Sequence, residues 1–284
     1  MALLSSPALQ DLIAKEDWQQ VAALCEQTLE AKPDVNLYAW YLGLALLMMG
    51  QEDEAQMVWL MAMAQGEERD INRWTGELLL VLDEEAERQQ HLEANAHAWT
   101  IRQHMRELDP TNLNNLLLLL LLSAQLNLFD SQQLVDWSVV PLLEQAPPAA
   151  VSLPILTQTL ADILSQYPID SAVDALTGAC VPYFQVGSPP TQTFITRANY
   201  LAYHDRRPDL AAQLLNQVQR LIPEDLLLLQ QLSCFNQNIG HHGEAIAVAQ
   251  RCCELSQTLM DQISSQHVLL RALMGVGSRW DGIE

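Results

Sequence analysis

The chain has 284 residues, of which 49% are apolar and 17% charged, and its 35 acidic residues against 14 lysines and arginines give a formal net charge of −21. The apolar content rules out a disordered or collagen-like chain, and the negative charge argues against binding to nucleic acid or to an anionic membrane. Good helix formers predominate and long alternations of Val, Ile and Thr are missing, so we expect an all-α fold.

A pattern of about 34 residues organises the first 69 positions. In residues 36–69, small and aromatic side chains take fixed places, namely Leu42, Gly43, Gly50, Ala55, Trp59 and Ala62. The spacing predicts two antiparallel helices, called helix A and helix B, which cross closely at Gly43 and Ala55 and are joined by a turn at Gly50. Residues 2–35 fit the same pattern, and Pro33 closes their helix B.

Residues 70–112 predict a longer helix pair. Its two helical stretches surround Trp74–Leu82 and Leu92–Leu108, and the acidic segment that begins at Asp83 lies between them. We interpret this segment, residues 83–87, as a solvated loop. The region is then an extended copy of the same pattern.

Residues 113–191 predict two degenerate helical pairs. The leucine run 116–122 is apolar on every side, so its helix should be buried on most sides. A second helix is expected over residues 131–145. Two further helices are expected over Leu153–Gln166 and Ser171–Tyr183, where prolines mark the ends.

The pattern returns in residues 192–259, which hold two more copies. Small and apolar residues occupy the corresponding places, namely Ala198, Ala202, Ala211, Leu215, Leu232, Gly240, Ala245 and Cys252. Residues 260–274 predict another helix A, and Ser278–Asp281 predict the start of its helix B. Because a solenoid needs a polar cap on its last apolar face, we expect residues 260–284 to be an incomplete final repeat. That repeat would continue into a further C-terminal region or be covered by another chain.

The four in-register copies resemble the tetratricopeptide repeat (TPR) family. This resemblance implies a right-handed superhelix of antiparallel helix pairs with degenerate central repeats. Two stretches, LGLALLMMGQEDEAQMVWLMAMAQGE and AWTIRQHMRELDPTNLNNLLLLLLLSAQL, are similar to the N-terminal TPR region of bacterial SPINDLY-like O-linked N-acetylglucosamine transferases or FkbM-type methyltransferases. The similarity implies an accessory arm that selects or positions acceptor proteins for a catalytic domain outside this sequence.

In TPR proteins helix A lines a concave face, which supplies the candidate binding residues. The predicted binding residues are Trp40, Leu44, Met48, Tyr200, Tyr203, Gln230 and Gln237, and Thr193, Thr196 and His204 take related positions. The face is apolar in the first copy and polar-aromatic in the later ones, which suits an amphipathic helix or an extended peptide held by Trp40, Tyr200 and Tyr203. The alternative is that these aromatic residues pack against adjacent repeats.

The histidines and cysteines lack the spacing that metal binding or catalysis would require. His97 and His104 are seven residues apart, whereas helical metal sites use pairs four apart. Cys252 and Cys253 are adjacent, so their side chains point about 100° apart on a helix. Because nucleotide-binding and hydrolase motifs are also missing, we expect no catalytic residue, no metal and no cofactor.

The expected setting is the cytoplasm. The longest purely apolar run is too short to cross a bilayer, and the N-terminus lacks the basic start of a signal peptide. Five scattered cysteines without CxxC spacing are typical of buried free thiols in a reducing compartment. We therefore expect a non-catalytic module that binds a protein or peptide, without nucleic acid or membrane. The alternative is a homo-oligomerisation or scaffold protein whose end repeats stack on a second copy.

Overall fold

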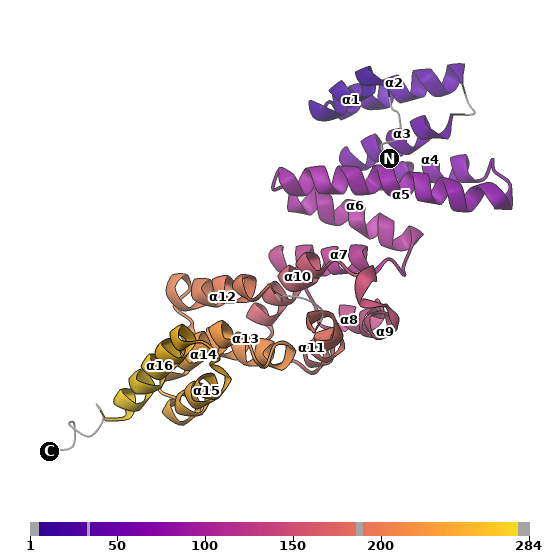
Figure 1. The fold of residues 1–284 in the computed structure, drawn as a ribbon. Helices are drawn as coiled ribbons and strands as arrows, with labels where there is room; N and C mark the ends of the chain where they lie inside the picture. The colour runs from indigo at the N-terminus through magenta and orange to yellow at the C-terminus, as the bar shows by residue number, and fades with distance from the viewer. Residues whose placement is uncertain (1–5, 33–34, 186–189, 278–284) are drawn as a thin grey trace. The chain divides into compact units, whose positions relative to one another are not determined.

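The computed structural model describes residues 6–32, 35–185 and 190–277, and within these ranges the fold is all-α. The described residues form sixteen α-helices, a 3₁₀ turn at Pro148–Ala150 and a π-helical segment at Tyr200–His204, with no strand among them (Figure 1). The chain divides into two compact units, residues 1–115 and 116–284. Within the described part of the chain, no helix is both long and apolar enough to span a membrane.

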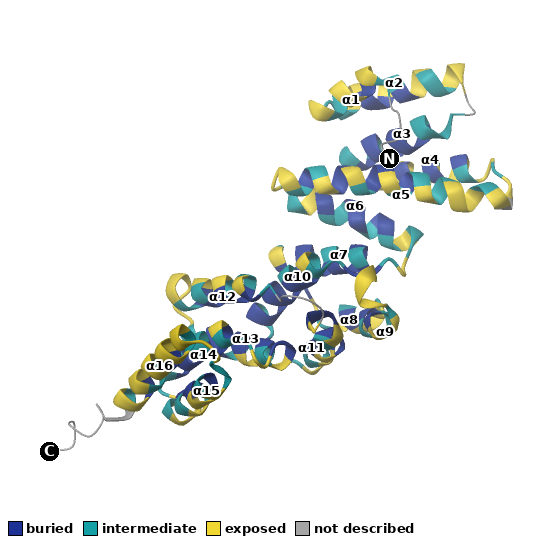
Figure 2. Cartoon of the chain, viewed as in Figure 1, coloured by how far each residue is buried: buried dark blue, intermediate teal, exposed yellow. Residues whose placement is uncertain are grey.

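The first unit is built from six consecutive helices. Their bounds are α1 Pro7–Ala14, α2 Trp18–Ala31, α3 Asn36–Met48, α4 Glu52–Met63, α5 Glu68–His91 and α6 Asn95–Leu108. Helix α3 packs against α2, α4 and α5, and α5 packs against α6. As a result α3 is buried along most of its length, and Figure 2 draws its buried residues in dark blue. The hydrophobic core of this unit runs from Leu9 to Met105.

The predicted close crossing of α3 and α4 is confirmed at Gly43. Trp59 of α4 lies directly over this glycine, and its Nε1 donates a hydrogen bond to the carbonyl oxygen of Trp40 at 3.2 Å. A Cβ atom on Gly43 would lie 2.6 Å from Trp59 Cδ1, so only glycine leaves room for the indole. The turn at Gly50 is also confirmed, with a φ of +78° that favours glycine. Ala55 is fully buried, whereas Pro33 lies outside the described residues.

The acidic segment 83–87 is not a loop, and that prediction is wrong. It lies inside α5, which runs without a break from Glu68 to His91. Two of its four acids are paired, since Glu85 lies 2.8 Å from Arg88 and Asp83 accepts a hydrogen bond from Arg102 of α6 at 3.1 Å. Paired glutamates favour a helix, and the chain instead turns at Glu93, whose φ is 60°.

The second unit contains the remaining helices. Their bounds are α7 Leu113–Gln125, α8 Gln132–Asp136, α9 Val139–Gln145, α10 Leu153–Gln166, α11 Ser171–Phe184, α12 Thr191–Asn199, α13 Pro208–Leu221, α14 Leu226–Asn238, α15 His242–Leu255 and α16 Leu259–Gly277. The start of α7 belongs to the first unit, up to Asn115. Burial of the leucine run 116–122 is confirmed, with Leu118 alone half-buried in that run. The helices expected at Leu153–Gln166 and Ser171–Tyr183 are confirmed as α10 and α11.

One helix of this unit was predicted wrongly. The stretch 131–145 is divided into α8 and α9 by Ser138, whose backbone is left-handed with a φ of 53°. Pro141 explains the break, because it has no amide hydrogen and its ring would clash with the carbonyl of Trp137 in a continuous helix. Pro141 is accommodated in the first turn of α9 instead.

The helices from α10 onward pack in a repeating order. Helix α10 contacts α11 and α12, α12 contacts α13 and α14, and α14 contacts α15 and α16. Each of α10, α12 and α14 therefore meets its own partner and the first helix of the next pair. In the first unit α3 does the same with α4 and α5. The residues Ser278–Asp281, which were expected to begin another helix, lie outside the described residues.

Candidate functional site

Two of the seven predicted binding residues are core residues of the first unit. The side chains of Trp40 and Leu44 are 0% and 1% exposed, and Met48 is half-buried. Because α3 packs against three helices, its apolar face has no open side at these positions. The expectation that Trp40 and Leu44 line an open face is wrong, and packing against neighbouring helices accounts for both.

The tyrosines of the second unit are exposed. Tyr200 and Tyr203 are 45% and 72% accessible, and both lie in the π-helical segment that ends α12. The widened turn is visible in the hydrogen bond from the Asp205 amide to the carbonyl of Tyr200, five residues earlier, at 3.2 Å. Segments of this kind often occur at functional sites, because the wider turn redirects side chains outward.

A hollow lies beside Tyr200 on the same face and is called the Tyr200 hollow. It has a volume of about 390 Å³ and is lined by residues of α10 and α12 together with Tyr200, namely Gln158, Asp162, Gln192, Thr193, Thr196, Arg197 and Tyr200. Thr193, Thr196 and Tyr200 occupy the helix A positions that the sequence pattern singled out. The structure therefore brings these three predicted positions together in one concave surface.

The charges in the Tyr200 hollow are paired with each other. Arg197 Nε lies 3.4 Å from Asp162 Oδ1 and donates to Ser165 Oγ at 3.1 Å. The same guanidinium lies 5.6 Å from the centre of the Tyr200 ring, a cation–π contact. Gln158 donates to Asp162 at 3.3 Å. The hollow thus presents amides, hydroxyls and one internally balanced ion pair, without an unpaired buried charge among the residues that line it.

Two ring contacts orient the tyrosines. His204 stacks on Tyr200 with 4.4 Å between ring centres and 18° between planes. Tyr203 lies 6.3 Å from the ring of Phe235 on α14. Since each ring has one supported face or edge, these contacts restrict the orientation of both tyrosines.

The two glutamines of α14 differ. Gln237 lines a second hollow of about 370 Å³ together with residues of α16, namely His267, Leu270, Arg271, Met274 and Gly275. Its Nε2 donates to the carbonyl of Arg271 at 2.8 Å. Gln230 is half-buried and lines neither hollow. Of the two predicted glutamines, only Gln237 therefore lies beside a hollow.

Sequence reasoning missed the polar residues of α10 and the role of Arg197. Asp162 is 5% exposed and is the one charged residue of α10, and this isolated acid was the available signal. Its partner Arg197 comes from α12. Because the two side chains are 35 positions apart, only the packing of α10 on α12 reveals the pair.

The thiols and histidines show no arrangement for covalent or metal chemistry in the described ranges. Burial raises the pKa of Cys25 to about 12 and that of Cys252 to about 11, and it raises the pKa of Cys180 as well. These thiols are protonated at neutral pH and are therefore poor nucleophiles. Among the described residues, no group of three or more His, Cys, Asp or Glu side chains is placed to hold a metal ion.

Sequence comparisons do not assign this arrangement of helices to a known protein family. No known protein family matches the chain, and no curated protein matches it either.

Proposed function

We propose that this chain is a non-catalytic, TPR-like helical-repeat protein that binds a segment of a partner protein on the helix A face of its second unit. The observation that carries the proposal is the Tyr200 hollow, in which Thr193, Thr196 and Tyr200 meet beside the exposed Tyr203. In the TPR pattern these are the positions that face the ligand.

The order of helix contacts supports a repeat architecture. In a solenoid of helix pairs, each helix A touches its own helix B and the next helix A, so that the A helices form one continuous face. The contacts of α10, α12, α14 and α16 follow this order. On this reading α10, α12, α14 and α16 are the A helices of the second unit.

The chemistry of the face suits an extended peptide. Side-chain amides of Gln158 and Gln192 and hydroxyls of Thr193 and Thr196 can satisfy the amide and carbonyl groups of a peptide backbone. Tyr200 and Tyr203 supply rigid apolar area with a polar tip, the combination typical of interface hot spots. In a transferase arm of the kind that the sequence resembles, this surface would hold the acceptor protein.

A peptide selection tests the proposal on the full chain. Displayed 12-residue peptides would be selected for binding, and the Kd of each would be measured for the native chain and for Tyr203→Ala and Thr196→Arg. We expect a class of peptides whose affinity falls at least tenfold with either substitution. Ile169→Ala is the matched control, since Ile169 is 80% exposed on the same unit but lies outside the hollow. Selected peptides that bind all four proteins equally would contradict the proposal.

The surface of α16 favours a second candidate function, association of two copies of the chain. Its exposed large apolar residues are Leu259, Met260, Ile263, Leu270, Leu273 and Met274. Exposed patches of this kind often mark protein interfaces. Light scattering over a dilution series checks this candidate. We expect a dimer that Ile263→Glu with Leu270→Glu converts to a monomer, whereas a native chain that is monomeric at every concentration would exclude it.

A further inference from the structure

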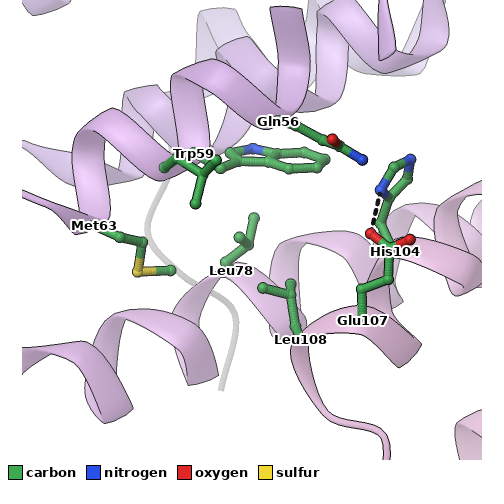
Figure 3. Close-up of a pocket in the computed structure, with 8 residues that line it drawn as sticks. Gln56, Trp59, Met63, Leu78, His104, Glu107 and Leu108 are labelled. Atoms are coloured by element: carbon green, nitrogen blue, oxygen red, sulfur yellow. Dashed lines mark ion pairs between the residues drawn. The ribbon is translucent and has the colours of Figure 1, made fainter. Parts of the chain in front are cut away.

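A separate cavity lies in the first unit, between α4 and α6 above α5, and is called the Trp59 cavity (Figure 3). Its volume is about 230 Å³. The apolar wall consists of the Trp59 indole, Met63, Leu78 and Leu108, and the polar edge consists of His104 and Glu107. A cavity of about 150 Å³ accepts benzene, so this one has room for a single leucine, methionine or phenylalanine side chain.

The walls of the Trp59 cavity are held in place. The Trp59 Nε1 atom donates to the carbonyl of Trp40, which fixes the plane of the indole. His104 meets the Trp59 ring edge-to-face with 5.7 Å between ring centres, and it is only 3% exposed. The cavity is thus preorganised, and filling it would not require the indole to move.

Carboxylates flank the polar edge of the cavity. Glu107 Oε2 lies 3.5 Å from His104 Nδ1, and Glu52 Oε1 lies 3.2 Å from His104 Nε2. The second contact lacks the alignment of a hydrogen bond, since His104 Nε2 has no hydrogen-bond partner. Both glutamate side chains are more than half exposed. They are therefore available to a cation that approaches from outside.

An apolar strip leads to the mouth of the cavity. Met57, Leu60 and Met61 of α4 are 59%, 67% and 62% exposed, and Leu60 itself lines the cavity. The first turn of the same helix carries the exposed acids Glu52, Asp53 and Glu54. The surface thus combines adaptable methionine and leucine side chains with negative charge at one end.

We propose that the Trp59 cavity is a second docking site, specific for a basic amphipathic helix of a partner protein. One apolar side chain of that helix enters between Trp59 and Leu78, its neighbours cover Met57 and Met61, and a lysine or arginine beside the anchor pairs with Glu107 and Glu52. This site is distinct from the proposed peptide face, since it is formed by α4, α5 and α6 of the first unit. Evidence against one of the two sites would leave the proposal for the other unaffected.

Charge decides which partner fits. An acidic amphipathic helix would bring like charge to the two glutamates, and a second copy of this chain carries a net charge of −21 of its own. A basic helix gains attraction at the rim and steering from the whole chain as it approaches. Met57, Leu60 and Met61 are three and four positions apart on α4, so their exposed side chains are neighbours on the helix and can contact the apolar face of a bound helix.

The test uses the full chain with ¹³C-labelled methionine methyl groups and displayed 16-residue peptides selected for binding. We expect a class of lysine- or arginine-rich amphipathic peptides that shifts the Met63 methyl signal. Their affinity should fall at least tenfold with Leu60→Glu and about threefold with Glu107→Gln. The signal of Met63 serves as the local probe because this residue lines the cavity.

Two matched variants distinguish binding in the Trp59 cavity from nonspecific electrostatic attraction and from binding at the peptide face of the second unit. Leu80→Glu changes an exposed residue of α5 outside the cavity, and Tyr203→Ala changes the second unit, so both should leave the affinity within twofold. Circular dichroism should confirm that each variant is folded. The proposal is overturned if no selected peptide shifts Met63, or if the peptides that shift it lack basic residues. It is also overturned if Leu60→Glu and Leu80→Glu act alike, or if Met63 shifts on self-association alone.

Discussion

The helix pairs α3–α4 and α12–α13 share the same sequence pattern but expose opposite kinds of surface. In the first pair, helix A is buried against three neighbours, and the exposed apolar residues are Met57, Leu60 and Met61 of helix B. In the second pair, helix A ends in a π-helical segment that exposes Tyr200 and Tyr203, while α13 buries its apolar face. The shared pattern therefore accounts for how the two helices of a pair pack, and it does not decide which of their side chains are exposed.

The number of neighbours explains the difference. Helix α3 is apolar on every side and meets α2, α4 and α5, so a residue such as Trp40 has no route to the surface. Helix α12 carries threonine, glutamine and arginine on its outer side, which keep that side open to water. The same position in the pattern can therefore be a core residue in one pair and a surface residue in another.

We expect the largest effect on the free energy of unfolding at Trp40, which was predicted to anchor a ligand but lies in the core. Trp40→Ala should lower the free energy of unfolding by about 3–5 kcal/mol, because it removes a large, fully buried side chain. Urea unfolding followed by circular dichroism measures this change. A loss below about 1 kcal/mol would show that Trp40 is not packed as described.

The close crossing of α3 and α4 gives the next largest effect. Gly43→Ala should cost about 2–3 kcal/mol, because the new methyl group would displace Trp59 and strain its hydrogen bond to Trp40. The matched control is Gly76→Ala in α5, where nothing lies within 4 Å of the added Cβ atom. That change should stabilise the protein by about 0.5–1 kcal/mol. Equal effects of the two substitutions in thermal unfolding would contradict the crossing.

Alkaline pH should weaken the first unit through Cys25. Burial, assisted by the charge of Glu26, raises the pKa of this thiol from 9.0 to about 12. Above pH 9 the unfolded chain has lost the proton while the folded chain retains it. The free energy of unfolding therefore falls as the pH rises, by about 1.4 kcal/mol per pH unit from this group.

The measurement compares urea unfolding at pH 8, 9 and 10 for the native chain and for Cys25→Ala. The variant should start less stable but lose less stability between pH 9 and pH 10. For Cys252 in the second unit the same loss should end near pH 11, where its raised pKa lies. Parallel pH profiles for the native chain and Cys25→Ala would refute the assignment.

The smallest effect is expected at the exposed tyrosine. Tyr203→Ala should change the free energy of unfolding by no more than about 0.5 kcal/mol, because the side chain is 72% exposed. Together with Trp40→Ala, this substitution contrasts a core aromatic residue with a surface one. A loss above about 1.5 kcal/mol would mean that the contact with Phe235 is structural and that Tyr203 is unsuited to a binding role.

Particular elements show why some predictions succeeded. The bounds of α10 and α11 follow from local signals, since Pro154 stands in the first turn of α10 and the Asp170 side chain accepts hydrogen bonds from the first amides of α11. The error at residues 83–87 arose because Glu85 pairs with Arg88 and Asp83 pairs with Arg102, and Arg102 lies on another helix. Thr193, Thr196 and Tyr200 of the predicted face line one hollow, which also contains the unpredicted Asp162.

The sequence by itself determined that the chain is helical, where helices such as α10 and α11 begin and end, and which glycine permits α3 and α4 to cross. These properties depend on residues that are close along the chain or in direct contact at one crossing. Only the tertiary structure decided that Trp40 is core, that Tyr203 is exposed and that Trp59 and His104 border a cavity. The physical reason is that burial depends on how many helices surround a side chain, and those helices come from distant parts of the sequence.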